Sequence, residues 1–353
     1  MTVDRRVREW LRSRETRPRS GFREDRIVVA ASGGADSSAL ALAVAESLRA
    51  LDRAPSASLV IAHFNHRLRP EADHAADLDV VRAVAERVGA PLVTSAAEPD
   101  EISTRAGSSG GVEAAARRLR YGFLAAAATA TGARTICTGH TRDDQAETVL
   151  MRLVSGIEGV LLSGIPRARP LDERLLVERP LLDASRSEIE CYLRENRVQW
   201  SSDSSNLAIR HRRNRVRHEM LPQIEPYWPA VRLDLVRLGE AMAHYRITVR
   251  EQAAGLDVEY DGPLARISRA AFFGLPADAR LELLYEVLDR LGLLDRADRP
   301  GHAFFAPVLG PDPGENRRLV EARRARIELK GDLLVVGRVL SAPMNGGIFR
   351  GIG

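Results

Sequence analysis

The sequence is nearly devoid of lysine. Lys330 is the only lysine among the 52 lysine and arginine residues of this 353-residue chain. Contacts between cationic side chains and phosphate groups therefore fall to arginine, whose planar guanidinium suits phosphate oxygens. With 48 acidic residues the formal net charge is +4, a mildly basic balance that is compatible with an anionic partner.

Cysteine and long apolar runs are also scarce. Cys137 and Cys191 are the two cysteines, and their separation argues against a disulfide framework or a zinc site. The chain lacks an apolar run long enough to span a bilayer. Residues 1–26 are charged throughout and lack the apolar core of a signal peptide. We therefore expect a cytoplasmic protein with no membrane segment.

What the chain does contain is an alternation of strand and helix patterns. Hydrophobic residues make up 44% of the sequence, and the length favours about two domains. The segments predicted as strands are 27–31, 58–64, 91–95 and 134–138, with helical patterns after each. This alternation predicts an α/β fold, a Rossmann-like parallel sheet with helices on both faces. Ligands bind beyond the C-terminal ends of such strands, so the loops that follow them should converge.

The second part is predicted to be a smaller, mostly helical domain with a hairpin. Prolines at 222, 226 and 229 suggest a boundary, which gives a first domain of 1–222 and a second of 223–353. The expected features are a helix over 230–252 and a hairpin of 326–329 with 333–339. In the first domain we expect a short helix over 7–11. The segments 98–111 and 156–179 are predicted to be irregular because they are rich in glycine, serine or proline.

The most informative stretch follows the first predicted strand and consists of Ser32, Gly33, Gly34, Ala35, Asp36 and Ser37. A glycine turn between a strand and a helix presents free backbone N–H groups and a positive helix end to an anion, above all phosphate. Asp36 would repel a bare phosphate and is better suited to Mg²⁺. An ordinary strand-to-helix turn is the alternative. No Gly-Lys-Ser/Thr sequence follows, so this is not a Walker loop.

A second group of polar residues follows the fourth predicted strand. His140, Asp144 and Glu147 lie within eight residues, and the two acids share one helix face. Such a set could hold Mg²⁺ and a cationic substrate. Alternatively, Thr141 and Asp144 form a helix cap and Glu147 lies on the surface. The sequence does not divide metal and substrate binding between Asp144 and Glu147.

Two further candidates come from neighbouring segments. Glu113 and Arg117 are equally well explained as an exposed pair four residues apart. Arg120 is the better candidate for contact with a triphosphate or a transition state. His63 and His66 follow the second predicted strand, where a structural role and a functional role are equally plausible.

A basic run occupies residues 210–218, with five arginines and Val216 as its only apolar residue. Charge runs usually form solvated faces. Here an ordinary amphipathic helix is improbable because so little of the run is apolar, and a polyanion such as tRNA fits better.

Together these motifs resemble the tRNA(Ile)-lysidine synthetases of the ATP pyrophosphatase, or PP-loop, superfamily. Four motifs match in order and spacing: Ser32–Ser37, His63–Arg69, Glu113–Tyr121 with Arg117 and Arg120, and Gly139–Glu147 with His140 and Asp144. A fifth, Asp203-x-x-Asn206 followed by Arg213-Asn214-Arg215-x-Arg217, is characteristic of this family within the superfamily. The resemblance covers about residues 25–225.

The resemblance implies an adenine nucleotide alpha-hydrolase-like fold and a two-step reaction. ATP would adenylate O2 of the first-anticodon-position cytidine of an isoleucine tRNA with a CAU anticodon. The side-chain amine of free L-lysine would then displace AMP and leave lysidine. The resemblance leaves open whether the chain forms a homodimer.

The resemblance also implies roles for individual residues, with ATP and Mg²⁺ as cofactors. Nucleotide contacts are expected from Ser32, Gly33, Gly34, Ala35, Asp36, Ser37 and His63. Metal contacts are expected from Asp36 and Asp144, and catalytic roles from Asp36, Arg120, His140, Asp144 and Glu147. The tRNA is expected to contact the second domain and Arg67, Arg69, Arg212, Arg213, Asn214, Arg215 and Arg217.

Three alternatives remain at the level of sequence. A tRNA thiolase of the same fold would normally need paired cysteines, which the chain lacks. An amide-forming NAD or GMP synthetase would not predict the basic run. A tRNA- or nucleotide-binding module without catalysis is the third alternative, and the substitution Asp36→Asn distinguishes it from an enzyme.

Overall fold

The computed structural model describes residues 2–15, 26–68, 70–106, 111–201, 212–293, 302–321 and 325–338. The chain forms two compact units, Met1–His244 and Tyr245–Gly353. The division falls within one long helix, α11 (Val231–Ala254), rather than near the prolines around residue 222.

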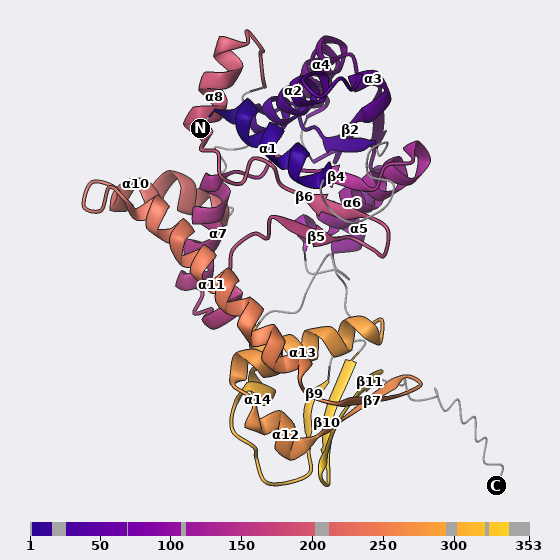
Figure 1. Ribbon diagram of the computed structural model, residues 1–353, viewed down its shortest axis with the longest axis vertical. Coiled ribbons are helices and arrows are strands. Elements are labelled where there is room, and N and C mark those ends of the chain that lie inside the picture. The colour runs from indigo at the N-terminus through magenta and orange to yellow at the C-terminus, as the bar shows by residue number, and fades with distance from the viewer. Residues whose placement is uncertain are drawn as a thin grey trace, which may run out of the picture. The chain divides into compact units, whose positions relative to one another are not determined.

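The first unit is an α/β unit (Figure 1). Before α11, its elements are α1 (Val3–Glu15), β1 (Ile27–Ala30), α2 (Ala35–Arg49), α3 (Pro55–Ser58), β2 (Leu59–Asn65), α4 (Glu71–Val88), β3 (Leu92–Ala96), α5 (Glu101–Ala106), α6 (Val112–Thr131), β4 (Thr135–Cys137), α7 (Arg142–Val154), the 3-10 helix η1 (Gly159–Leu162), β5 (Ala168–Pro170), β6 (Leu176–Glu178), α8 (Arg186–Glu195), α9 (Arg212–Arg215), the π-helix η3 (Val216–Met220) and α10 (Leu221–Ile224).

The central sheet has six strands in the order β3-β2-β1-β4-β6-β5. Strand β1 pairs in parallel with both β2 and β4, so Ile27 lies opposite Leu59 on one side and Thr135 on the other. Strand β6 continues the parallel pairing, and only β5 is antiparallel. The predicted fold class is confirmed. The prediction of an irregular segment over 156–179 is wrong, because β5 and β6 extend the sheet there.

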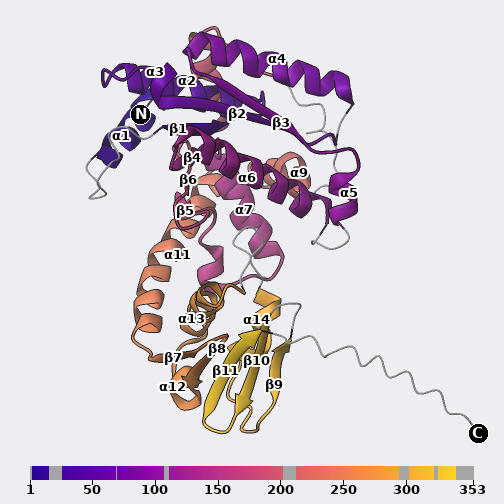
Figure 2. The ribbon, with the colours of Figure 1, turned by 90° about the vertical axis from the view of Figure 1, so that its right-hand side faces the viewer.

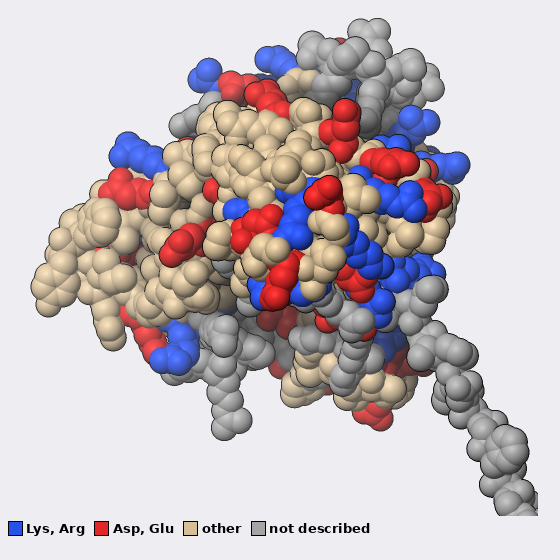
Figure 3. Space-filling view, turned by 90° about the horizontal axis from the view of Figure 1, so that it is seen from below, with Lys and Arg blue, Asp and Glu red and all other residues tan. Residues whose placement is uncertain are grey.

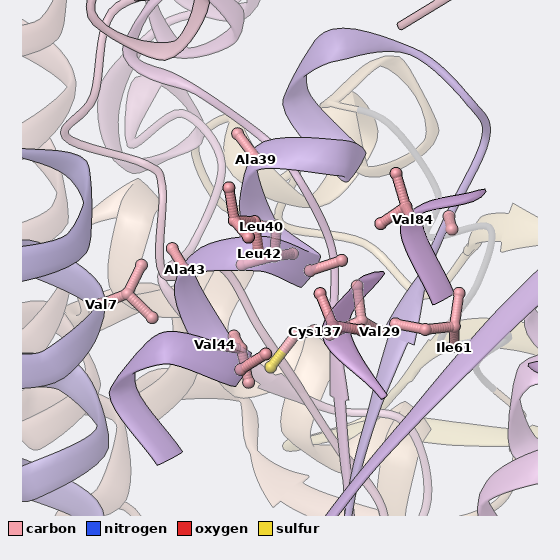
Figure 4. Packing of buried hydrophobic residues seen from close by; sticks show 14 of the residues in the cluster. Val7, Val29, Ala39, Leu40, Leu42, Ala43, Val44, Ile61, Val84 and Cys137 are labelled. Atoms are coloured by element: carbon pink, nitrogen blue, oxygen red, sulfur yellow. The ribbon is translucent and has the colours of Figure 1, made fainter. Parts of the chain in front are cut away.

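Helices cover both faces of this sheet, as the α/β pattern requires. Figure 2 shows α4 and α6 on opposite sides of β1, β2 and β3. Successive residues of a strand point to opposite faces, and Val29 accordingly joins the core beneath α2, whereas Val28 packs with Tyr121 and Leu124 of α6. The first of these cores also includes Val7 of α1 (Figure 4).

Two helices differ from their predicted extents. Helix α1 continues to Glu15, beyond the predicted end at residue 11, and its Arg14 forms a buried ion pair with Glu178 of β6 at 2.5 Å. A short helix, α5, occupies part of the predicted irregular segment 98–111 and buries Ile102. Helix α1 is fixed by a contact with a distant segment, whereas α5 packs on α6, the next helix in the chain, and local composition reveals neither contact.

The described part of the basic run is helical, contrary to prediction. Residues 212–224 form α9, η3 and α10 in succession. Val216, the only apolar residue of the run, is buried with Leu150 of α7 and Leu235 of α11. Val216 and Leu221, both buried in this core, hold the segment as a helix together with ion pairs from Arg213 and Arg217 to α7.

The second unit contains a five-stranded antiparallel sheet in the order β7-β8-β11-β10-β9. After α11 its elements are β7 (Val258–Asp261), β8 (Leu264–Ser268), α12 (Arg269–Gly274), α13 (Ala277–Arg290), α14 (His302–Leu309), β9 (Arg318–Glu321), β10 (Ala325–Lys330) and β11 (Leu333–Arg338). The predicted hairpin is confirmed as β10 and β11, and three further strands join it.

The surface gives two further observations. None of the helices in the described ranges combines the length and the hydropathy needed to span a membrane. On the face shown in Figure 3, acidic and basic side chains lie interspersed. The excess of arginine is therefore not gathered into one basic area on that face.

Candidate active site

Residues Ser32–Ser37, which lead from β1 into α2 and which we call the nucleotide loop after their predicted role, have the geometry of an anion cradle. Gly33 has a φ of +87°, and a Cβ atom there would lie 2.9 Å from the carbonyl oxygen of Asp77, so glycine is required. The Ser37 hydroxyl donates to the Gly34 carbonyl at 3.1 Å and accepts from the Ser32 amide at 3.1 Å. The N-cap residue of α2 is Gly34, which has no side chain to cap the helix, and such an uncapped first turn can offer its amides to a ligand.

Asp36 in the first turn of α2 is a carboxylate without a full set of partners. Its Oδ1 atom is buried and has no hydrogen-bond partner among the described residues. Burial raises the pKa of Asp36 to about 6, and the nearby charge of Asp144 acts in the same direction. Arg186 and Arg217 act in the opposite direction and do not cancel the effect. An unpartnered buried carboxylate oxygen beside a second carboxylate is suited to a cation.

The loop after β4 packs directly on this helix start. A Cβ atom on Gly139 would lie 2.9 Å from the carbonyl carbon of Asp36, so the two backbones are in close contact. Next to it, Nδ1 of His140 lies 2.9 Å from the Thr138 hydroxyl. Burial lowers the pKa of His140 to about 3, and the positive charge of Arg179 adds to the effect. His140 is therefore a neutral hydrogen-bonding group near neutral pH.

Asp144 closes the first turn of α7 and also faces the site. Its Oδ2 atom accepts from the Thr141 amide at 2.9 Å, and the two residues form a reciprocal capping box. Its Oδ1 atom accepts from Arg217 at 3.2 Å. The helix cap is therefore confirmed, and it uses only Oδ2, so Oδ1 is left to Arg217.

Glu147 is fully buried, which excludes the surface alternative. Its carboxylate accepts from Nε of Arg217 at 2.6 Å and from Nη2 at 3.0 Å, and Nε of Arg213 lies 3.4 Å away. Burial raises the pKa of Glu147, and the hydrogen bond from Arg217 opposes that shift. Asp144, Glu147 and Arg217 thus form one charged group beside Asp36. Within the described ranges, no three His, Cys, Asp or Glu side chains form a complete metal site.

The residues predicted to bind tRNA are found in different environments. Arg67 and Arg215 are exposed, and Arg215 lies 3.6 Å from Glu219. Arg217 instead faces the acids of α7, and Arg213 donates to the Thr148 hydroxyl at 3.0 Å. Asn214 is partly buried. Arg69, Asp203, Asn206 and the side chain of Arg212 lie outside the described residues.

His63 lies beneath the nucleotide loop and is buried. Its Nδ1 atom lies 3.0 Å from the carbonyl oxygen of Ala31, the residue that leads from β1 into the loop. The side chain therefore contacts the backbone that positions the loop.

Arg120 lies in a group of arginines that sequence reasoning did not assemble. Its guanidinium carbon is 5.5 Å from the ring centre of Tyr121, and burial lowers its pKa. Arg169 and Arg179, near or on the β5–β6 hairpin, belong to the same group. Arg179 begins the Arg-Pro-Leu-Leu sequence that leads into α8, but nothing local links it or Arg169 to α6.

Comparison with known proteins identifies the family. A PP-loop domain family matches residues 2–224. The chain is 38% identical to the tRNA(Ile)-lysidine synthase of Rhodopseudomonas palustris over 327 residues, which cover 88% of this chain and 89% of that protein. The chain belongs to the tRNA(Ile)-lysidine synthase family. The resemblance predicted from the motifs is thereby confirmed.

Other members of the lysidine synthase family are longer. The tRNA(Ile)-lysidine synthase of Thermus thermophilus is 38% identical over 278 residues, and that of Deinococcus deserti is 40% identical over 287 residues. These matches cover 78% and 80% of this chain. The chain spans half the length of each of these two relatives, 50% in both cases.

A solved structure supports the fold of this lysidine synthase family member. The U34-tRNA thiolase NcsA from Methanococcus maripaludis, determined with its 4Fe-4S cluster, superimposes with a TM-score of 0.50 over 69% of this chain and 79% of that one. The sequences are 16% identical, so the likeness concerns the fold alone. The two cysteines of the present chain lie apart, with Cys137 buried in β4 and Cys191 exposed on α8.

Proposed function

We propose that the chain is an ATP-dependent tRNA-modifying ligase that forms lysidine. ATP adenylates O2 of the first-anticodon-position cytidine of an isoleucine tRNA with a CAU anticodon, and pyrophosphate leaves. The side-chain amine of free lysine then forms a bond to C2, and the bond from O2 to that carbon breaks as AMP departs. Family membership supports this proposal, and the convergence of the nucleotide loop with Asp36, Asp144 and Glu147 is the observation that carries it.

The nucleotide loop would bind the leaving pyrophosphate. Its amides between Gly33 and Ser37 lie at the positive end of α2, and the serine hydrogen bonds keep the loop in shape without a ligand. Asp36 and Asp144 are the residues that would hold Mg²⁺. When bound, Mg²⁺ would neutralise charge on the phosphate oxygens, and it commonly uses one or two carboxylates together with substrate phosphates.

Arg120 and neutral His140 would contact the adenylyl group as it is transferred from ATP to the cytidine. Arg120 supplies positive charge near His140, and His140 can donate or accept one hydrogen bond without a change in charge. His63 would act indirectly, through the Ala31 carbonyl that precedes the loop.

Asp144 and Glu147 would bind the ammonium group of lysine. The amine must lose a proton before it can attack, and Glu147, whose pKa burial raises, can accept it. Arg217 occupies these carboxylates in the structure, so the lysine ammonium would share or displace its hydrogen bonds. Exposed Arg67 and Arg215, with the second unit, would contact the tRNA backbone. A cytoplasmic location belongs to the same proposal.

The test is AMP release from ATP with purified protein and an isoleucine tRNA carrying a CAU anticodon. We expect sustained release only when lysine is present, together with the appearance of lysidine in digested tRNA. A tRNA whose first anticodon base is uridine is the matched control and should give no product. Incorporation of sulfur from cysteine or nitrogen from ammonia, in place of lysine, would refute the proposal.

A further inference from the structure

A cluster of four arginines surrounds a buried tyrosine beside the candidate active site. Tyr121 is only 2% exposed. The guanidinium carbons of Arg117, Arg120 and Arg169 lie 4.9, 5.5 and 4.7 Å from its ring centre, and the charge of Arg179 also acts on it. We refer to these five residues as the Tyr121 arginine cluster. They come from α6, β5 and the position just after β6, so the fold brings them together.

The cluster contains buried donors with no acceptor. Nε, Nη1 and Nη2 of Arg169 and Nε of Arg179 are buried and have no hydrogen-bond partner within the described ranges. Arg179 is 4% exposed, and its Nη1 atom donates to the Pro166 carbonyl at 2.5 Å. A buried guanidinium without an acceptor is costly, because neither water nor protein replaces its lost hydration. These donors therefore indicate that an acceptor is missing.

The balance of charge shows that the missing acceptor should be an anion. Burial alone would raise the pKa of Tyr121, but the four arginine charges lower it to about 8. Glu113 is the carboxylate that acts on Arg120, and its effect is smaller than those of Tyr121 and Arg117. Among side chains, arginine is the one best suited to bind phosphate through paired N–H groups.

The cluster adjoins the reaction site. Arg179 and Arg120 both act on His140, in the loop that contacts the start of α2. The amides of the nucleotide loop lie at a different place, between β1 and α2. A phosphate bound by the cluster is therefore a second phosphate, additional to the one in that loop.

We propose that the Tyr121 arginine cluster is a second phosphate-binding site, with Arg169 and Arg179 as its new binding residues. This inference rests on the proposed function for the identity of the ligand. The phosphate belongs either to the nucleotide or to the tRNA backbone next to the modified base, and both offer the same oxygens to the guanidinium groups.

The main test compares Arg169→Gln with Arg174→Gln, because Arg174 is exposed on the same hairpin and serves as a matched control. Dissociation constants are measured separately for ATP and for the isoleucine tRNA. If the phosphate is that of the tRNA, Arg169→Gln weakens tRNA binding about tenfold and lowers the salt dependence by about one counterion. If it is that of the nucleotide, the loss of about tenfold appears for ATP instead. Changes below about twofold for both ligands, relative to Arg174→Gln, would overturn the inference.

A second measurement uses the unsubstituted protein and holds even if Arg169→Gln fails to fold. Tyrosine ionisation is followed by absorbance at alkaline pH with inorganic phosphate, or with chloride at equal ionic strength, and Tyr121→Phe identifies the signal. Phosphate should shift the ionisation of Tyr121 to higher pH, since a bound anion disfavours the phenolate. No shift would contradict the inference. This assay needs no turnover, so it separates failure of the cluster from failure of lysine-dependent AMP release.

Discussion

Each compact unit contains a buried glutamate held by two arginines. Glu147 on α7 contacts Arg217 at 2.6 Å and Arg213 at 3.4 Å, and its side chain is 0% exposed. Glu282 on α13 contacts Arg246 at 2.6 Å, and its side chain is 2% exposed. Its other oxygen accepts from Arg250 at 2.6 Å. By burial and pairing alone, the two glutamates are nearly equivalent.

The surroundings of Glu147 and Glu282 differ. Arg217 is shared between Glu147 and Asp144, and Asp144 in turn acts on Asp36, whose Oδ1 atom has no partner among the described residues. Glu282 divides its two oxygens between two arginines of α11 and links that helix to α13. The comparison teaches that a buried ion pair does not mark a site. A local excess of carboxylates that the described residues leave incompletely paired is the stronger indication of one.

The strongest test of this distinction is Asp36→Asn. We expect AMP release to fall by about 10²–10³-fold, because a charged contact in the transition state is lost. The free energy of unfolding of this variant should be about 1–3 kcal/mol higher than that of the wild type at pH 7, because the substitution removes a buried, incompletely paired charge. Lysine-dependent AMP release and denaturant unfolding measure the two effects. Retained turnover would show that Asp36 takes no part in the reaction.

The second test is Glu147→Gln. Loss of the charge should lower kcat/KM for lysine by about 10–100-fold, the value of a hydrogen bond to a charged group. Binding of ATP should change by less than about twofold, since the nucleotide loop is untouched. Initial rates at varied lysine, combined with direct ATP titration, separate the two. Equal losses for both ligands would mean that Glu147 acts through the fold of the site.

The third test is the pH dependence of the charged group around Asp36. The pKa of Asp36 is raised to about 6 in the folded chain, so kcat/KM should fall about tenfold per pH unit below that value. The stability of the folded chain should change with pH in the opposite direction from kcat/KM. The folded state binds this proton more tightly than the unfolded chain, whose ordinary value is 3.8. The contribution of Asp36 to stability is therefore fully present below pH 3.8 and is lost as the pH rises through about 6.

Both pH dependences are checked between pH 4 and pH 8 with the wild-type protein and Asp36→Asn. Rate profiles give kcat/KM, and unfolding curves give the free energy of unfolding. The stability advantage of the variant should grow with pH across that range. A constant difference would show that the carboxylate does not titrate there.

The smallest effect on activity is expected for Glu282→Gln, the matched control from the second unit. Removing its charge leaves Arg246 and Arg250 without their partner and should lower the free energy of unfolding by about 1–3 kcal/mol. Activity of the folded fraction should stay within about twofold of the wild-type value. Chemical denaturation and kcat/KM provide the comparison. A loss of activity as large as that of Glu147→Gln would remove the distinction between the two glutamates.

Much of the first unit could be predicted because its signals are local. The β-branched run of β1, the glycines after it and the alanine-rich helix that follows define the nucleotide loop without reference to the rest of the chain. The rule that loops meet at strand ends then brings His63, Asp36 and His140 to one edge of the sheet.

What could not be predicted depends on contacts between distant segments. Strands β5 and β6 have three residues each, too few to show a pattern, and they are held by pairing with their neighbours. The basic residues around Arg217 predict contact with a polyanion but do not reveal the carboxylates with which Arg217 pairs. Its acceptors lie on α7, 70 and 73 residues away in sequence. Arg169 likewise meets Tyr121 only after the hairpin has joined the sheet.

The close approach of Gly139 to Asp36 has a consequence for engineering. The main chains of the two residues are in contact there, since a Cβ atom on Gly139 would lie 2.9 Å from the carbonyl carbon of Asp36. The first turns of α2 and α7, which carry the acids, are therefore held in fixed positions. Under the proposed function, variants intended to accept an amine other than lysine should therefore change the ends of side chains around Glu147 and keep this junction. A shorter or longer amine would have to be matched by a side chain of different length, because the backbones at this contact are too close to move.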